Sequence, residues 1–312
     1  MSASADAFPG GETARAATRG SRRRVKLGAV GRVSTLCAVA AIFLFLLITF
    51  ILAAFRTRQS MTSANPLSGL SLANLNYDWT QIRGFDSGLF TTWYRNSLIV
   101  CGGGTVLSLL SGIPAGYALA KLKFPFRRTV LLVTILTMVT PNTVLVIPLF
   151  LEVEKIHALG QLWPVAVIFG FFPFGTYMAY IHFETALPKE LIEAARVDGL
   201  SELGIFTRVA LPVSKQAVAI VGFFSFLASW TNYFLPLVLL PIGNQQTLTV
   251  GLQQLITGSQ LYDPSGAAGS PVQLYMPQLI FAAVLQTAPL LVIFVIAQRF
   301  LARGATVGAV KQ

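Results

Sequence analysis

Few residues in this sequence could carry out acid–base, nucleophilic or metal chemistry. The two histidines, His157 and His182, lie near the ends of apolar segments and form no H-E-x-x-H pattern. Cys37 and Cys101 lie inside apolar segments without a nearby histidine or second cysteine, so we interpret both as small buried hydrophobic residues. The sequence has no G-x-x-x-x-G-K-[ST] phosphate-binding loop. We therefore expect no enzyme activity, no ATPase motif, no metal and no cofactor on this chain.

The charged segment 184–215 lies between two apolar segments and predicts two short helices joined by a turn. Pro188 suits the first position of a helix, where its missing N–H has no partner to lose. Glu190 and Glu193 then fall in the first two turns, where the positive end of the helix dipole stabilises them. Gly199 predicts the end of this helix, because glycine adopts the left-handed conformation at a helix C-terminus without strain.

The second helix of this loop should be short and should end before Pro212. Ser201 can cap its N-terminus. Leu211 precedes the proline, which disfavours helical backbone at that residue. Both helices are too short to cross a bilayer, so we expect them at the membrane surface.

Glu193, Ala194 and Ala195 could form a docking surface for another protein. The two alanines would let the backbone of a partner approach closely, and Glu193 would present an anion to a cationic groove. The alternative is an amphipathic helix that rests on lipid headgroups, although such helices usually carry a basic rather than a mixed polar face.

The composition indicates that membrane-spanning helices position these residues. Hydrophobic residues make up 54% of the chain and charged residues 11%, whereas a soluble domain carries about 25% charged residues. The apolar residues form segments of about 20, the length that crosses a hydrocarbon core. We predict an all-α integral membrane protein with six transmembrane helices, at Val33–Phe55, Asn96–Leu122, Thr129–Leu151, Leu162–Phe183, Gln216–Leu240 and Pro277–Leu301.

The distribution of Lys and Arg predicts the orientation of these spans. Of the 23 Lys and Arg residues, 18 lie in one alternating set, formed by the N-terminal segment, residues 121–128, the 184–215 loop and the C-terminus. Since loops on the cytoplasmic side are enriched in Lys and Arg, we expect both termini in the cytoplasm. The net charge of +11 then reflects topology in a cytoplasmic (inner) membrane, and no nucleic-acid partner is indicated.

The spans divide the chain into segments. We expect a disordered basic N-terminus at 1–32, a first transmembrane helix at 33–55, an extracytoplasmic loop at 56–94, a core of five spans at 95–302 that includes the 184–215 loop, and a cytoplasmic tail at 303–312. The first apolar segment exceeds the roughly 7 to 15 residues of a signal peptide, so we interpret it as an anchor. The turn-rich run at 262–271 could contact an outer partner or serve only as a connector.

Glycine and proline interrupt several predicted spans, at Gly102–Gly104, Gly112–Gly116, Pro141, Pro148 and Pro173. They predict either kinks in a moving bundle or close helix packing. No Asp, Glu, Lys or Arg lies deep within a span, whereas ion-coupled carriers commonly use one. The main alternative function, an ion-coupled secondary carrier of a small polar solute, would then need sites built from carbonyl and hydroxyl groups.

The spacing within the 184–215 loop is distinctive. Glu193-Ala194-Ala195 is followed after three residues by Gly199, after nine more by Val209, and after one more by Leu211-Pro212. This pattern resembles the EAA loop of permease subunits of bacterial binding-protein-dependent ABC importers, which have Ile in place of Val209. The likeness covers residues 76–312 and is greatest to the carbohydrate branch, including MalG-type subunits of maltose transporters. It extends to Asn96-Ser97-Leu98, Ile147-Pro148-Leu149-Phe150, Pro173-Phe174, Gln298-Arg299-Phe300 and Gly308-Ala309-Val310-Lys311.

The resemblance implies a type I ABC importer (MetI-like) permease architecture and a set of partners. These are a homologous second permease subunit, two cytoplasmic ATPase subunits that hold ATP and Mg, and an extracytoplasmic solute-binding protein. The substrate would be a sugar: an oligosaccharide, a monosaccharide or a polyol phosphate. The residues implied to couple the chain to the ATPase are Glu193, Ala194, Ala195, Asp198, Gly199, Leu211 and Pro212.

Candidate residues for the substrate pathway lie in the fifth predicted span. An aromatic face suits the apolar face of a sugar ring, although aromatic residues in spans more often pack or anchor at the interface. The segment Trp230–Phe234 also departs from the Trp-Asn-Asp-Phe of many relatives. The candidates are Phe223, Phe224, Trp230, Asn232 and Tyr233.

Overall fold

The computed structural model describes the backbone of residues 11–63, 65–259, 262 and 274–307, and the side chains of 31–63, 65–259, 262 and 274–300. Every regular element within these ranges is a helix. Four helical stretches are long and apolar enough to cross a membrane, and two bent helix pairs would raise the number to six. The described residues therefore confirm the all-α prediction, and they allow six spans, two of which would be bent helix pairs.

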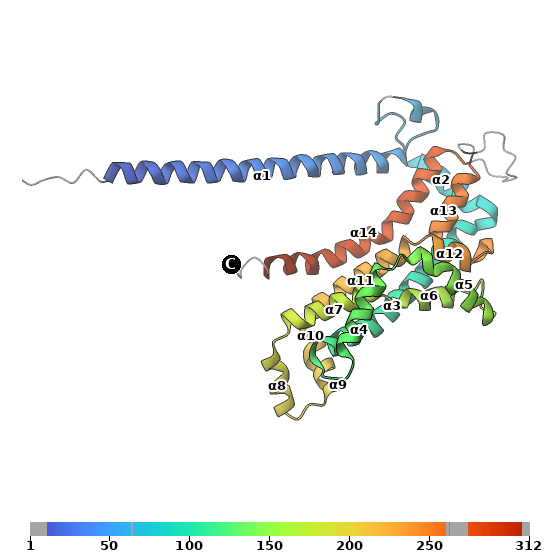
Figure 1. Cartoon of the computed structure of the whole chain (residues 1–312). Helices are drawn as coiled ribbons and strands as arrows, with labels where there is room; N and C mark the ends of the chain where they lie inside the picture. The colour runs from blue at the N-terminus through green and yellow to red at the C-terminus, as the bar shows by residue number, and fades with distance from the viewer. Residues whose placement is uncertain (1–10, 64, 260–261, 263–273, 308–312) are drawn as a thin grey trace, which may run out of the picture.

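The first span belongs to a long helix, α1 (Gly11–Ala53), that projects away from the other helices (Figure 1). It begins before the predicted Val33 and takes in residues 11–32, which the sequence predicted to be disordered; residues 1–10 lie outside the described part. Its apolar side chains are exposed, with Leu36 at 69% and Phe43 at 68%. Because a helix that exposes apolar side chains all round is not stable in water, α1 requires lipid around it.

The predicted outer loop 56–94 contains regular structure: η1 (Gln59–Thr62), α2 (Leu72–Gly84), η2 (Phe85–Gly88) and the first turns of α3. The Asn74 amide donates to the Phe55 carbonyl over 2.7 Å and ties α2 to the end of α1. α2 also packs on α14 (Met276–Val307). At this contact the buried Asp78 carboxylate accepts a hydrogen bond of 2.5 Å from Gln278 Nε2.

The central helix is α3 (Leu89–Lys121), which lies against α6 (Leu162–Gly170) and α7 (Pro173–Ala186). A Cβ added at Gly116 would lie 2.5 Å from the Cβ of Ala179, and one at Gly104 would lie 2.7 Å from the Cβ of Phe169. α3 also continues through Pro114. At these positions the glycines allow close helix packing. The sequence left this interpretation open beside kinks in a moving bundle.

Three of the predicted spans are each made of more than one helix. In place of a single span at Thr129–Leu151, α4 (Arg127–Val139), η3 (Asn142–Leu145) and α5 (Val146–Lys155) form a pair bent by 96°. Pro141 explains this break, because proline has no N–H and favours the extended backbone that Thr140 adopts, with ψ 123°. α6 and α7 are separated just before Pro173, and the span Gln216–Leu240 divides into α11 (Lys215–Trp230) and α12 (Phe234–Leu239).

The segment after α12 comprises η5 (Gly243–Gln245) and α13 (Leu248–Thr257), and α3 holds it in place. Asn96 Nδ2 donates to the carbonyls of Asn244 and Gln246, each over 3.0 Å. Ser97 Oγ accepts from the N–H of Leu248 over 2.7 Å. The pair Asn96-Ser97 thus pins a segment about 150 residues away in sequence. Residues 263–271 of the turn-rich loop and 308–312 of the predicted tail lie outside the described part.

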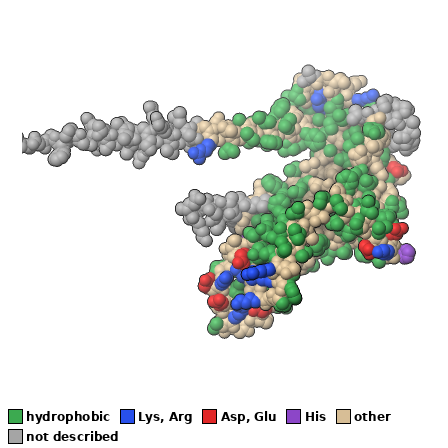
Figure 2. Space-filling view, in the orientation of Figure 1, with side chains coloured by type: hydrophobic (Ala, Val, Ile, Leu, Met, Phe, Trp, Pro, Cys, Tyr) green, Lys and Arg blue, Asp and Glu red, His purple; other side chains and the backbone are tan. Residues whose placement is uncertain are grey.

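Charged side chains gather at two ends of the molecule, with apolar side chains between them (Figure 2). One group covers α8 (Lys189–Val197) and α9 (Glu202–Ile205), and the other lies near α5. The beginning of α1, the end of α14 and α8 all lie toward the same side (Figure 1). An apolar band between two charged ends is the arrangement expected of helices that cross a bilayer.

Candidate functional site

The first half of the 184–215 loop has the helix and glycine turn that the sequence predicted. α8 starts one residue after Pro188, which occupies the N-cap position. The helix closes in a Schellman turn: Gly199 N–H donates to the Arg196 carbonyl over 3.0 Å, and Leu200 N–H to the Ala195 carbonyl over 3.1 Å. Gly199 has φ +83°, so the predicted left-handed conformation is confirmed.

The second helix begins where Ser201 was expected to cap it. Ser201 Oγ accepts from the N–H of Gly204 over 3.3 Å. Across the turn, Arg196 Nε donates to Glu202 Oε1 over 2.7 Å. This hydrogen bond raises the pKa of Arg196 above its ordinary value. Since both side chains are about half exposed, the pair mainly sets the geometry between α8 and α9.

The prediction that this helix ends by Leu211 is wrong. After α9 the chain forms a π-helical turn, η4 (Phe206–Ala210), and then α10 (Leu211–Val213). Leu211 is right-handed helical, with φ −65° and ψ −45°. Pro212 is tolerated because it stands at the start of a new helical turn, where its missing N–H needs no partner. The direction changes by 80° between this segment and α11.

The inner side of the loop is fastened to the spans by a buried apolar cluster. From the loop, Ile192, Ala195 and Ile205 are each at most 5% exposed. They pack with residues of α3, α7 and α11, including Tyr117 and Phe183. Lys121 Nζ also donates to the Leu187 carbonyl over 2.8 Å. Because well-packed interiors deform little, a force on the loop would move the ends of these helices.

The outer side of the loop exposes a small polar and apolar surface. Glu193, Ala194, Asp198 and Gly199 are all exposed on it. Ala195 is 5% exposed and belongs to the inner cluster, so Ala194 alone of the two alanines is accessible. Leu211 is half-buried, and Pro212 is exposed beyond the π-turn, away from the glycine turn.

Two apolar residues extend this surface and were missed in the sequence analysis. Val197 is 88% exposed and Leu203 is 73% exposed, and they lie on either side of the Gly199 turn. Val197 follows Ala194 by three residues, so the helical period places it on the same exposed side. That period was the signal in the sequence that could have identified it. We call Glu193, Ala194, Val197, Asp198, Gly199 and Leu203 the coupling surface, after the role that the resemblance implies for this loop.

The structure buries one candidate of the substrate pathway. Trp230 is 2% exposed, stacks on Phe226 with ring centroids 5.2 Å apart, and donates from Nε1 to the Gln286 carbonyl over 2.9 Å. The aromatic ring is therefore part of the core that joins α11 to α14. Trp230 thus packs between helices in this structure, as span aromatics often do, and its place in the substrate pathway stays a prediction.

The other four candidates are more accessible. Phe223 meets Phe294 of α14 at 6.0 Å between ring centroids, and Phe224 meets Phe174 of α7 at 5.5 Å. Asn232 and Tyr233 lie in the break between α11 and α12. Asn232 Oδ1 accepts from the N–H of Leu235 over 3.2 Å and so supports the start of α12. The two phenylalanines thus face different helices, and the two polar residues lie at a helix break.

Comparison with known proteins assigns the chain to a family. Residues 112–307, which include the whole coupling surface, match the family described as the binding-protein-dependent transport system inner membrane component. The chain belongs to this family. It is therefore an integral membrane component of a transport system, in agreement with the exposed apolar helices described above.

Named relatives of this transport component cover most of the chain. The arabinooligosaccharides transport system permease protein AraQ of Halalkalibacterium halodurans is 32% identical over 278 residues, which is 88% of this chain and 93% of the relative. The maltodextrin transport system permease protein MdxG of Bacillus subtilis is 29% identical over 229 residues, or 73% of this chain and 78% of the relative.

A solved structure shares the fold of this transport component. It is the crystal structure of a bacterial ABC transporter involved in the import of the acidic polysaccharide alginate. The match has a TM-score of 0.69 and 22% sequence identity, and it covers 89% of this chain and 97% of the other. The helices described here therefore have the fold of an ABC importer chain, which is the architecture that the resemblance implied.

Proposed function

We propose that this chain is a pore-forming permease subunit of an ATP-driven ABC importer that takes up a sugar across the cytoplasmic membrane. The family and the names of the relatives support transport and a sugar substrate. Both termini and the coupling surface would face the cytoplasm, as the Lys and Arg distribution predicts. The chain itself has no phosphate-binding loop, so ATP and Mg are held by its partners.

The observation that carries this proposal is the two-sided construction of the 184–215 loop. Its outer side presents two carboxylates, those of Glu193 and Asp198, and a small side chain. It also presents two exposed apolar side chains, Val197 and Leu203. Its inner side is packed into α3, α7 and α11 through the buried cluster. A loop that is bound on one side and fastened on the other can transmit the movement of a partner to the spans.

The partners are a homologous second permease subunit, two cytoplasmic ATPase subunits and an extracytoplasmic solute-binding protein. ATP binding closes the ATPase dimer and displaces the coupling surface, and α3, α7 and α11 follow because the buried cluster links them to it. Such coupling requires that the ATP-bound partners bind one conformation of the permease more tightly than the other. Hydrolysis then returns the spans to the inward-facing state.

The substrate class can be narrowed within the sugars. The relatives named above transport arabinooligosaccharides and maltodextrin by their names, which favours an oligosaccharide over a monosaccharide or a polyol phosphate. Ligand screening of the solute-binding protein that works with this chain would identify the sugar. A preference of that protein for an amino acid or a metal ion would overturn the sugar assignment.

A charge reversal on the coupling surface tests the proposal directly. Glu193→Lys places a cation where the ATPase groove is expected to be cationic, and we expect uptake to fall by about tenfold or more. The matched control is Glu154→Lys, an equally exposed residue at the end of α5. Uptake of radiolabelled sugar and the amount of each variant in the membrane are measured together. Normal uptake by Glu193→Lys would contradict the coupling role.

The energy source distinguishes this function from an ion-coupled secondary carrier. In proteoliposomes that hold the complete transporter, with the sugar and its binding protein outside, uptake should require ATP in the lumen, on the side of the ATPase, and should persist with a protonophore. Uptake that stops with the protonophore and continues without ATP would establish the carrier instead.

A further inference from the structure

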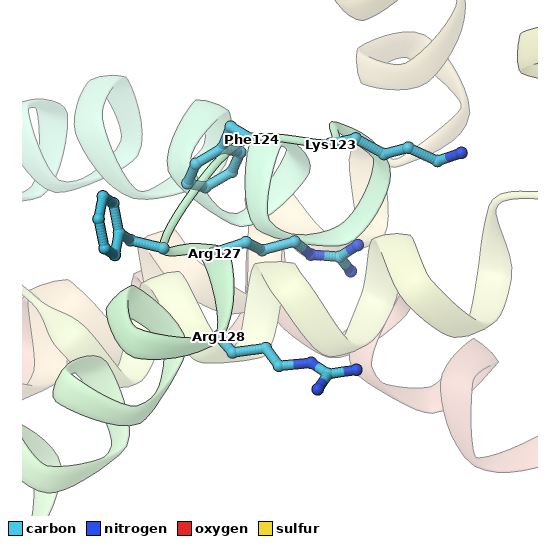
Figure 3. A pocket seen from close by; sticks show the side chains of 5 residues that line it. Lys123, Phe124, Arg127 and Arg128 are labelled. Atoms are coloured by element: carbon cyan, nitrogen blue, oxygen red, sulfur yellow. The ribbon is translucent and has the colours of Figure 1, made fainter.

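A basic hollow lies at the connection between α3 and α4, outside the coupling surface. Its volume is about 360 Å³, and Lys123, Phe124, Phe126, Arg127 and Arg128 line it (Figure 3). The three cationic side chains extend to one side of the connection, and the ring of Phe124 lies on the other (Figure 3). The hollow therefore combines a concentrated positive charge with aromatic surface.

One cation of the hollow is fixed by the protein, and two are available. Arg127 donates from Nε to the Leu119 carbonyl over 2.5 Å and from Nη2 to the Ala120 carbonyl over 3.1 Å. It also lies 3.8 Å from Glu184. The side chains of Lys123 and Arg128 are exposed, and within the described part of the chain neither side chain forms a hydrogen bond or an ion pair.

The surroundings of the hollow are those of a membrane interface. Phe126 is 78% exposed and Phe124 38%. From here α4 continues with exposed apolar side chains, including Leu132 at 56% and Val133 at 52%. Aromatic residues beside an exposed apolar helix are typical of the boundary between headgroups and hydrocarbon. A ligand in the hollow would thus have its charged part beside the cations and its apolar part along α4.

The start of α4 adds to the positive potential. Its first turn contains Arg127 and Arg128 and no acidic residue, and its N-cap, Phe126, provides no side-chain hydrogen bond. Glu184 pairs with Arg127 here, but within the described residues no acidic side chain pairs with Arg128. A cation at the positive end of a helix is unfavourable unless an anion lies near it. We propose that this hollow binds the phosphate of an anionic phospholipid headgroup, with Lys123 and Arg128 as its ligands and Phe126 against the acyl chains.

The exposed aromatic residues favour a lipid over two other anions. Inorganic phosphate would use the same cations but gain nothing from Phe126. An acidic protein surface would use the cations too, but it would have to cover an aromatic side chain that stands beside the apolar face of α4. The proposal is independent of the sugar and of ATP coupling, because it concerns residues away from the coupling surface.

Lipid binding to the intact transporter tests this site. The full-length chain is purified with its partner subunits, and phosphatidylglycerol or phosphatidylcholine is added after delipidation and followed by native mass spectrometry. We expect the double variant Lys123→Gln and Arg128→Gln to bind phosphatidylglycerol about thirty-fold more weakly, since each cation near a membrane surface contributes about fivefold. Phosphatidylcholine binding should not change. The matched control is Arg95→Gln with Lys155→Gln, which removes two exposed cations elsewhere.

The remaining arms separate the sources of the anion. Phe126→Ala should weaken phosphatidylglycerol binding as well, which a site for free phosphate would not show. Displacement of the lipid by millimolar inorganic phosphate would overturn the lipid assignment. Equal losses in the double variant and its control, or loss of an ATPase subunit from the double variant with lipid binding intact, would overturn the site.

Discussion

The turn at Gly199 allows a prediction whose magnitude follows from the structure. Gly199 has φ +83°, and a Cβ added there would meet no atom within 4 Å. A substitution therefore introduces no clash within this chain. Its effect on the conformation of the chain comes only from the φ that residue 199 must adopt. A left-handed conformation costs an ordinary L-residue about 1 to 2 kcal/mol. Asparagine tolerates this conformation best, alanine less, and β-branched valine least.

We therefore expect all three substitutions to lower substrate-stimulated ATP hydrolysis. The loss should be smallest for Gly199→Asn, larger for Gly199→Ala and largest for Gly199→Val. At about 2 kcal/mol the valine variant would populate the Schellman turn roughly thirty-fold less than the wild type relative to other turn conformations. The assay is substrate-stimulated ATP hydrolysis by the assembled transporter in liposomes, with thermal unfolding to confirm that each variant is folded.

The asparagine variant makes this experiment decisive. Asparagine and valine are similar in size, so a direct clash with the ATPase would damage both variants equally. Equal damage would refute the conformational argument, and so would full stimulation in the valine variant.

Three further predictions concern the contacts that hold the spans together. Gly116→Ala should destabilise the protein by about 1 to 3 kcal/mol, because its Cβ would overlap α7. Gly102→Ala should not destabilise it, because a Cβ there meets no atom within 4 Å. Thermal unfolding in detergent checks both variants. Asn96→Ala should cost about 1 to 3 kcal/mol by leaving the carbonyl of the buried Gln246 unpaired. Arg95→Ala, an exposed neighbour, should leave the unfolding temperature unchanged. Asp78→Asn retains a hydrogen-bond acceptor for α14 and should leave ATP-driven uptake intact in proteoliposomes, whereas a proton carrier that used this carboxylate would lose uptake.

The helical class and the turn of the coupling loop could be predicted because they depend on local chemistry. A glycine that must adopt positive φ and a serine that caps a helix are set by their own backbone, and Gly199 and Ser201 have the predicted conformations. The positions of the apolar segments follow from the length of a bilayer-crossing helix in the same way. These features do not depend on distant parts of the chain.

The features that were missed depend on tertiary packing. The continuation of the helix through Pro212 requires a π-turn, and the preference of a residue before proline does not indicate one. Ala195 faces inward because it belongs to the buried cluster that also contains residues of α3 and α7, which the Glu-Ala-Ala pattern does not show. Trp230 is buried for the same reason, since its partner Gln286 lies on α14.

The link from Asn96 to the α12–α13 segment has a consequence for the synthesis of the protein. Its acceptors are made about 150 residues after the asparagine itself, which takes roughly 8 to 30 s at the usual speed of translation, about 5 to 20 residues per second. Throughout that interval the Asn96 amide lacks the two carbonyls that it pairs with in the folded chain. A nascent chain stalled before residue 244 would therefore leave Asn96 without both acceptors, and the α12–α13 segment could not yet be attached to α3.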